Sequence, residues 1–292
     1  MIFLDHLING LSLGSIYAII ALGYTMVYGI AKMLNFAHGD VIMVGAYVAF
    51  CGLQYWGLSP VLAILVAMVA CTILGITIEG LAYRPLRQAA SLAVLITAIG
   101  VSYLLQNIAL MIWGANPKSF PTTFINGTSI RLGQLSISSA TIITILANVV
   151  IMVGLTLFTT KTKMGKAMRC VSEDRGAAEL MGINVNRTIS LTFAIGSALA
   201  AIAGILLCSS YPILQPTTGS MPGIKAFTAA VFGGIGSIPG AMLGGILLGV
   251  IEIFGKAYIS TELGDAIVFA VLIIVLLVKP AGLLGMPMRE KV

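Results

Sequence analysis

The sequence predicts an all-α polytopic membrane protein with about eight full transmembrane helices and one short or broken helix. Of its 292 residues, 59% are hydrophobic and only 9% are charged, whereas soluble domains carry about 25% charged residues. Apolar runs of about twenty residues, long enough to cross a bilayer, recur along the whole chain. The net charge of +6 comes from basic residues in short loops, so it reflects membrane topology rather than nucleic-acid binding.

Eight stretches have the length and composition of full spans, and together they are expected to form one domain over residues 1–292. They are residues 7–28, 39–56, 60–82, 92–113, 139–159, 189–209, 238–256 and 264–279. A ninth stretch, 224–235, is apolar and glycine-rich but too short to span fully. We expect it to be a short pass or a segment that re-enters from one side.

Basic residues set the expected orientation, because loops rich in Lys and Arg stay in the cytoplasm. The turn at 83–91, the loop at 160–188 and the tail with Lys279, Arg289 and Lys291 are all basic. With nine crossings, this places the N-terminus outside and the C-terminus in the cytoplasm. The 114–138 segment then forms a long external loop, suited to dock something that arrives from outside.

The loop at 160–188 is the one long charged run between apolar stretches, and it contains a pattern typical of a short helix. Ser172 can cap that helix, Glu173 and Asp174 suit its first turn, and Gly182 is a natural stop. Three residues form an apolar stripe on one face, namely Ala177, Leu180 and Met181. The pattern favours a helix that docks in a groove of a partner, and the alternative is a solvated loop that only sets topology.

The run FGGIGSIPGAMLGGILLG, residues 232–249, predicts a discontinuous helix. Glycines recur every four residues on two adjacent ridges, which lets neighbouring helices approach closely: Gly236, Gly240 and Gly244 on one ridge, Gly245 and Gly249 on the next. Ser237 and Pro239 suit a helix start after the break. Such breaks commonly line a substrate path, and the alternative is a tight packing seam without substrate contact.

Few ionisable residues lie within the apolar stretches. His38 and Asp40, in the motif NFAHGD, favour capping or gating near the cytoplasmic mouth over a proton relay. Glu252 is the one credible site for an ion-coupled transporter, while Glu79 is expected to reach towards Arg84 and the headgroups. With only two histidines and four scattered cysteines, no metal site or disulfide is indicated.

Motifs for catalysis and nucleotide binding are missing from the sequence. Gly165-Lys166-Ala167 lacks the first glycine and the Ser/Thr of a phosphate loop, and there is neither a GxSxG nor an HExxH motif. The chain is therefore expected to be a non-catalytic transport subunit, powered by a separate ATPase. The rival classes are an ion-coupled secondary transporter, a passive channel and an intramembrane enzyme.

Three segments together resemble the LivH-type permease of bacterial branched-chain amino acid ABC importers. They are LINGLSLGSIYAIIALGYTMVYGI with NFAHGD, EDRGAAELMGINVNR, and AFTAAVFGGIGSIPGAMLGGILLG, and the resemblance extends in order over nearly the whole chain. The resemblance implies a permease of the bacterial inner membrane that moves leucine, isoleucine or valine inward. Permeases for urea or short-chain amides have similar motifs and remain the alternative.

The resemblance also implies partners and site residues. The partners are a paralogous permease, two cytoplasmic ABC ATPases that bind ATP and Mg, and a periplasmic substrate-binding protein; the chain itself would hold no cofactor. The expected ATPase-coupling residues are Glu173, Asp174, Arg175, Ala177, Ala178, Glu179, Leu180, Met181 and Gly182. The expected path or gate residues are Asn35, Phe36, His38, Gly39, Gly233, Gly234, Gly236, Ser237 and Gly240.

Overall fold

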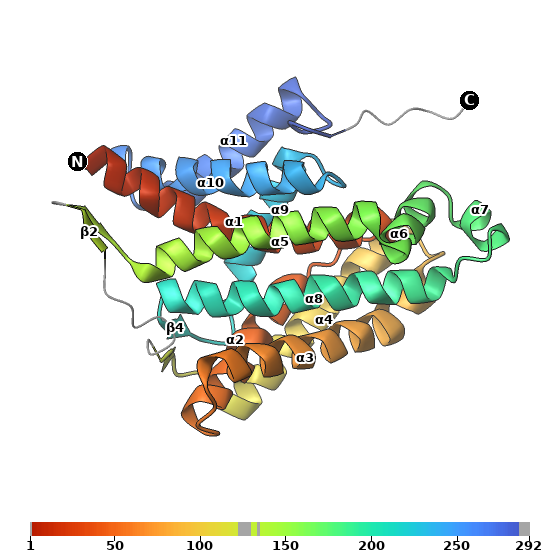
Figure 1. Cartoon of the computed structure of the whole chain (residues 1–292), viewed down its shortest axis with the longest axis horizontal. Coiled ribbons are helices and arrows are strands. Elements are labelled where there is room, and N and C mark those ends of the chain that lie inside the picture. The colour runs from red at the N-terminus through yellow and green to blue at the C-terminus, as the bar shows by residue number, and fades with distance from the viewer. Residues whose placement is uncertain (1, 122–129, 133–134, 286–292) are drawn as a thin grey trace.

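The computed structural model describes residues 2–121, 130–132 and 135–285, and helices dominate them (Figure 1). The helices are α1 (Ile2–Ala31), α2 (His38–Gln54), α3 (Pro60–Ile78, continued by short turns to Leu86), α4 (Ser91–Trp113), α5 (Ser139–Lys161), α6 (Lys163–Glu173), α7 (Arg175–Leu180), α8 (Val185–Ser210), α9 (Ser220–Gly233), α10 (Ile238–Tyr258) and α11 (Gly264–Val278). The strands are β1 (Lys118–Ser119), β2 (Ile130–Leu132), β3 (Leu135–Ile137) and β4 (Ile213–Leu214).

The fold class is confirmed, and each of the nine predicted apolar stretches is a helix. Six helices in the described part of the chain are long and apolar enough to cross a membrane, namely α1, α3 with its continuation, α4, α5, α8 and α10. Two helices predicted as full spans are shorter than expected, with 17 residues in α2 and 15 in α11. The predicted short pass is the 14-residue helix α9.

Helix α2 is short because it begins inside the bundle. The ring of His38, its first residue, lies 4.7 Å from the ring of Tyr24. Tyr24 precedes the end of α1 by seven residues, about 10 Å along a helix. The segment 32–37 therefore turns back into the protein before α2 starts.

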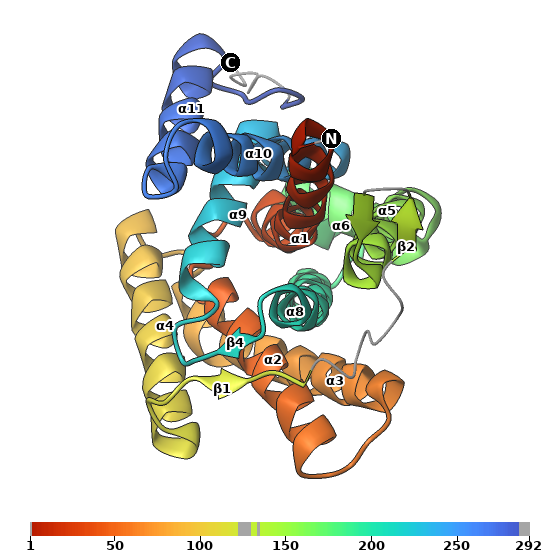
Figure 2. The same cartoon turned by 90° about the vertical axis from the view of Figure 1, so that its left-hand side faces the viewer.

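The core is built around two helices that are buried over most of their length, α1 and α8. Figure 2, viewed along the bundle, shows α1 between α10, α9, α5 and α8. Helices α3, α4 and α5 lie at the periphery and expose large apolar side chains, for example Leu62, Ile96 and Leu146. Exposed apolar faces on peripheral helices are what a protein surrounded by lipid requires.

The two predicted glycine ridges of α10 face two different helices. A Cβ added at Gly249 would come within 2.2 Å of the backbone of Gly14, and one at Gly245 within 2.4 Å of Ala18, so this ridge packs on α1. A Cβ at Gly244 would come within 2.2 Å of the Ala229 carbonyl oxygen, so the other ridge packs on α9. Only residues without a large side chain permit both approaches.

The predicted break lies between α9 and α10. Gly234 and Gly236 adopt φ of +106° and +95°, a left-handed conformation that glycine tolerates best. Ser237 caps α10 by accepting a hydrogen bond from the Gly240 amide at 3.2 Å, as the sequence predicted. The carbonyls at the end of α9 are satisfied by the segment after α11, because the Leu283 and Leu284 amides donate to Phe232 and Gly233, each at 2.9 Å.

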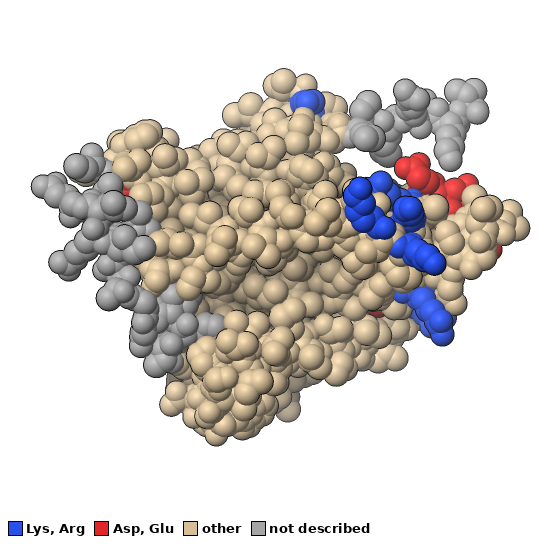
Figure 3. Space-filling view, viewed as in Figure 1, with Lys and Arg blue, Asp and Glu red and all other residues tan. Residues whose placement is uncertain are grey.

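The two ends of the bundle differ. One end, where α1 begins, has the strand pair β1–β4 and the hairpin β2–β3. The expected loop 114–138 lies at this end, although its residues 122–129 and 133–134 lie outside the described chain. The opposite end has α6 and α7, and Figure 3 shows Lys and Arg gathered there beside a group of acidic side chains. The exposed basic residues of α6 and its flank are Lys161, Lys163, Lys166 and Arg169.

Candidate functional site

The charged segment at one end of the bundle folds as two consecutive helices. In α6, Thr162 caps the helix by accepting from the Gly165 amide at 2.9 Å. Gly165, Met168 and Val171 are buried at a spacing of three residues, and the basic side chains lie on the other face. Helix α6 is therefore an amphipathic helix that covers the end of the bundle.

The predicted start of the short helix was wrong. Asp174, not Ser172, is the cap of α7, and its Oδ1 accepts from the Ala177 amide at 3.1 Å. Glu173 is the last residue of α6, and the Ser172 hydroxyl donates to the Arg169 carbonyl within α6. The predicted stop is confirmed, since Gly182 has φ of +78° and its amide donates to the Glu179 carbonyl at 2.9 Å.

Helix α7 is anchored at few points and exposes most of its surface. Ala178 is its one buried residue, and the Arg175 guanidinium donates to the Ala31 carbonyl at the end of α1. Leu180 and Met181 are 91% and 81% exposed. Two large apolar side chains at the tip of a polar segment are an unfavourable arrangement in water unless something covers them.

The motif at residues 35–40 contacts several helices. The Asn35 side-chain oxygen accepts from the Tyr83 hydroxyl at 2.8 Å, and Phe36 lies 5.4 Å from Phe227 of α9, between ring centroids. Gly39 lies against the start of α9, where a Cβ would come within 2.7 Å of the Gly219 carbonyl oxygen. The structure thus brings Phe36 and Gly39 to α9, whose other end contains Gly233 and the break.

One polar residue of this motif does not behave as expected. Asp40 is not a helix cap, because α2 has no side-chain cap and the Asp40 carboxylate accepts from Gln106 of α4 at 2.9 Å. Gln106 also donates to the Ser220 hydroxyl at 3.2 Å, which ties α4 to the starts of α2 and α9. His38 is 1% exposed and packs against Gly23, where a Cβ would come within 2.5 Å of its Nε2.

Glu79 also pairs differently from the expectation. It is 1% exposed and bonds Arg87 rather than Arg84. The Ser190 hydroxyl of α8 donates to its Oε2 at 2.6 Å. The short turns after α3 bring Arg87 close to Glu79. The spacing of these residues in the sequence did not reveal this contact. The pair stays buried because the charges and hydrogen bonds compensate each other.

A buried charge cluster joins four helices. Glu252 of α10 is 1% exposed, and its Oε1 accepts from Lys225 of α9 at 2.8 Å and from Lys256 at 2.6 Å. Its Oε2 accepts from the Tyr17 hydroxyl of α1 at 2.8 Å. Lys225 also pairs with Asp265 of α11 at 2.6 Å.

The sequence singled out Glu252 but did not show that Tyr17, Lys256 and Asp265 join it in this cluster. One signal was available, since Glu252 and Lys256 are four residues apart on one helix and such pairs are neighbours. Tyr17 and Asp265 come from distant parts of the chain, and no spacing indicates them.

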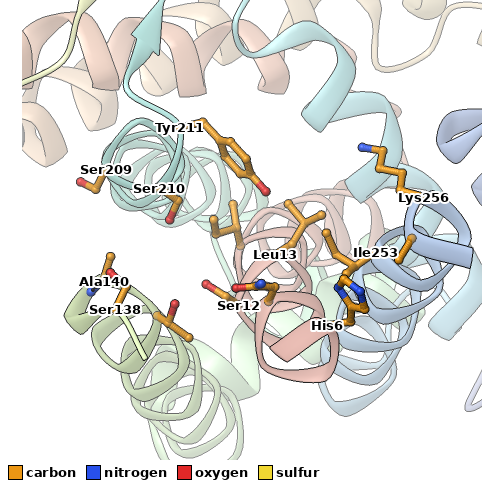
Figure 4. A pocket seen from close by; sticks show the side chains of 14 residues that line it. His6, Ser12, Leu13, Ser138, Ala140, Ser209, Ser210, Tyr211, Ile253 and Lys256 are labelled. Atoms are coloured by element: carbon orange, nitrogen blue, oxygen red, sulfur yellow. Dashed lines mark hydrogen bonds between the residues drawn. The ribbon is translucent and has the colours of Figure 1, made fainter. Parts of the chain in front are cut away.

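Two cavities of about 510 and 520 Å³ open at the end of the bundle opposite α7. Figure 4 shows the first, between α1, α5, α8 and α10, with Ser12, Ser138 and Ser210 around it and Lys256 on the far side of α1. The second is bordered by α1, α8, α9 and α10 and includes the charge cluster. Leu13, Tyr211 and Lys256 line both cavities.

Comparison with known proteins shows to which family a chain with this architecture belongs. A family profile described as "Branched-chain amino acid transport system / permease component" matches residues 6–276. The chain belongs to this family. This confirms the resemblance seen in the motifs and identifies the chain as a transport permease, for which the six or more apolar helices give a multi-pass membrane location.

The similarity to curated permeases is extensive. The chain is 47% identical to the high-affinity branched-chain amino acid permease protein BraD of Pseudomonas aeruginosa and 48% identical to LivH of Salmonella typhimurium, in each case over 99% of this chain and 98% of the relative. It is 31% identical to a probable LivH of Methanocaldococcus jannaschii over 94% of this chain and 90% of the relative. No large part of the permease is left without a counterpart.

Proposed function

We propose that this permease moves leucine, isoleucine or valine across the bacterial inner membrane into the cytoplasm, and that partner ATPases drive the movement. The observation that carries the proposal is the 47–48% identity, over nearly the full length of both chains, to proteins named as high-affinity branched-chain amino acid permeases. The chain contributes a path and a docking element, and ATP and Mg are bound by its partners.

The docking element in this proposal is α7 with its flanking residues, Glu173 to Gly182. Its exposed apolar residues, Leu180 and Met181, would insert into a groove on an ABC ATPase, which removes them from water. Exposed Glu179 lies beside them for polar contacts at the rim of that groove. The anchor from Arg175 to α1 would pass the movement of the ATPase to the core of the bundle.

The broken segment between α9 and α10 would form part of the path or gate. Gly233 and Gly240 let the two helices approach, and a Cβ on Gly29 of α1 would lie 3.3 Å from Gly236, so the break faces α1 near its last turn. Phe36, which packs on Phe227 in the middle of α9, would move with this helix. A path at helix breaks suits a transporter because free backbone groups can face a polar substrate there.

The basic end around α6 is assigned to the cytoplasm, because loops rich in Lys and Arg remain inside. In this orientation the N-terminus lies outside, the C-terminus lies inside, and the end with β1 and β4 meets a periplasmic binding protein. Arg289 and Lys291 of the basic tail lie outside the described residues. A second, paralogous permease would complete the transmembrane unit, with residues 1–292 of this chain as one permease domain.

ATP-driven uptake in proteoliposomes tests the proposal. The complete complex, with its partner permease, ATPases and binding protein, is expected to accumulate leucine when ATP is enclosed with the ATPases. Uptake of urea in place of leucine would reassign the cargo. Uptake that collapses with an uncoupler while ATP stays high would instead make the protein an ion-coupled transporter.

A further inference from the structure

The cavity of about 520 Å³ between α1, α8, α9 and α10 lies where a substrate from outside would enter. Its walls come from the first half of α1, the end of α8 and the end of α10, all at the end opposite α7. Pockets that bind small molecules in proteins have volumes of about 300–1,000 Å³, so this cavity is large enough for such a ligand. Its lining residues are Leu13, Tyr17, Leu207, Tyr211, Ile213, Gln215, Thr217, Thr218, Ser220, Met221, Pro222, Lys225, Glu252 and Lys256.

Charges of both signs line this cavity. Lys225 and Lys256 are positive and Glu252 is negative, and Asp265, which pairs with Lys225, makes the cluster of four formally neutral. A neutral cluster can take in a ligand with zero net charge without leaving an uncompensated charge, which would be costly away from water. It can also bind both ends of a ligand that has two opposite charges.

The hydrogen bonds of the cluster leave capacity for such a ligand. An ammonium group has three N–H donors. In the described chain Lys225 donates to Glu252 and Asp265, which leaves one donor, and Lys256 donates to Glu252, which leaves two. The side chain of Lys256 is 33% exposed and can reach a molecule in the cavity. These donors suit a carboxylate.

Acceptors for a positive group are present on the same wall. A carboxylate has about four lone-pair sites, and Glu252 accepts from three donors, Tyr17, Lys225 and Lys256. The hydroxyl of Tyr211, which is half exposed, and the side-chain oxygen of Gln215 add further acceptors. The apolar part of the lining, for example Leu13, Leu207 and Met221, suits an aliphatic side chain.

We propose that this cavity is an outward-facing transit site that binds the α-carboxylate and α-ammonium of a free aliphatic amino acid. Lys256 and Lys225 hold the carboxylate, and Glu252 with Tyr211 holds the ammonium. The inference rests on the proposed function and specifies it. Urea and short-chain amides have no charges to match these groups, so the cavity favours an amino acid as the cargo.

The ratio of leucine imported to ATP hydrolysed tests the site in the reconstituted complex. Lys256→Gln is expected to lower leucine uptake by about fivefold or more, the effect of losing one charge-assisted hydrogen bond. Hydrolysis stimulated by the loaded binding protein is expected to stay within about twofold of the wild-type rate, because α7 and its anchor are unchanged. Lys256→Arg should restore most of the uptake. Lys166→Gln, on the exposed face of α6 and outside the cavity, is the matched control.

Two results would overturn the site. One is wild-type uptake together with wild-type hydrolysis in Lys256→Gln, and the other is a parallel loss of uptake and hydrolysis, which would mean that Lys256 supports assembly only. A binding measurement without the binding protein gives a second readout. Millimolar leucine should raise the Tm of the detergent-purified complex, whereas leucinamide, without the carboxylate, and 4-methylpentanoate, without the ammonium, should not.

The Tm measurement distinguishes a failure of this site from a failure of the proposed function. If the wild-type complex imports no leucine, the proposed function fails, yet a Tm shift specific to leucine and absent in Lys256→Gln would still support the site. Equal shifts with leucine and 4-methylpentanoate would overturn it, even where transport is normal.

Discussion

The guanidinium of Arg175, the first residue of α7, donates to the backbone carbonyl of Ala31, the last residue of α1. Burial, and after it the nearby charge of Arg87, lowers the pKa of Arg175 from its ordinary value, but arginine remains charged in proteins. A cation at the end of a helix interacts favourably with the negative end of its dipole. The contact joins the largely exposed helix α7 to α1, which is buried over most of its length.

Replacing Arg175 is therefore expected to weaken coupling more than assembly. In Arg175→Ala, ATPases should still copurify with the permease, because Leu180 and Met181 are intact, but leucine-stimulated hydrolysis should fall several-fold. Arg169→Ala, on the exposed face of α6, is the control and should behave as wild type. Loss of copurification in Arg175→Ala alone would show that the contact shapes the docking surface instead.

The exposed apolar tip of α7 is expected to carry the affinity for the ATPases. Leu180→Asp combined with Met181→Asp should abolish copurification, since two charges would have to be buried in an apolar groove. Membrane insertion and the Tm of the permease alone should not change, because both side chains are more than 80% exposed. Copurification at the wild-type level, measured by gel filtration of the complex, would rule out this docking surface.

The α1–α10 seam should tolerate no side chain. Gly249→Ala places a Cβ against the backbone of Gly14 and should destabilise the protein by about 1–3 kcal/mol, the usual cost of overpacking. Gly154→Ala, on the exposed face of α5 with no atom within 4 Å of an added Cβ, should be neutral or stabilising by up to about 1 kcal/mol. Thermal unfolding in one detergent compares the two, and equal Tm values would contradict the seam.

The buried pair of Lys225 and Glu252 predicts a non-additive double mutant. Glu252→Gln alone removes the charge that compensates two lysines and should cost about 3–5 kcal/mol. Lys225→Met added to it should recover part of that loss, because the remaining charges, Lys256 and Asp265, are 33% and 43% exposed and can reach water. Additive losses in thermal unfolding would show that the two residues act independently.

Much of this protein could be predicted from its sequence. The apolar stretches marked all nine helices of the bundle, because a bilayer requires runs of apolar residues whatever the neighbours are. The break before Ser237 and the stop at Gly182 followed from the local preferences of glycine and capping residues. The coupling and path roles of the motifs followed from the family resemblance and remain proposals.

Only the tertiary structure decided which groups meet. The cap of α7 is Asp174 and not the predicted Ser172, because α6 extends to Glu173. Three buried residues of α6 pack it on the end of the bundle. Asp40 bonds Gln106 rather than capping α2, because the segment 32–37 turns inward and buries it against α4. Lys225, Glu252, Tyr17 and Asp265 come from four helices. Local spacing describes one helix at a time, so it cannot show contacts that arise from packing distant helices together.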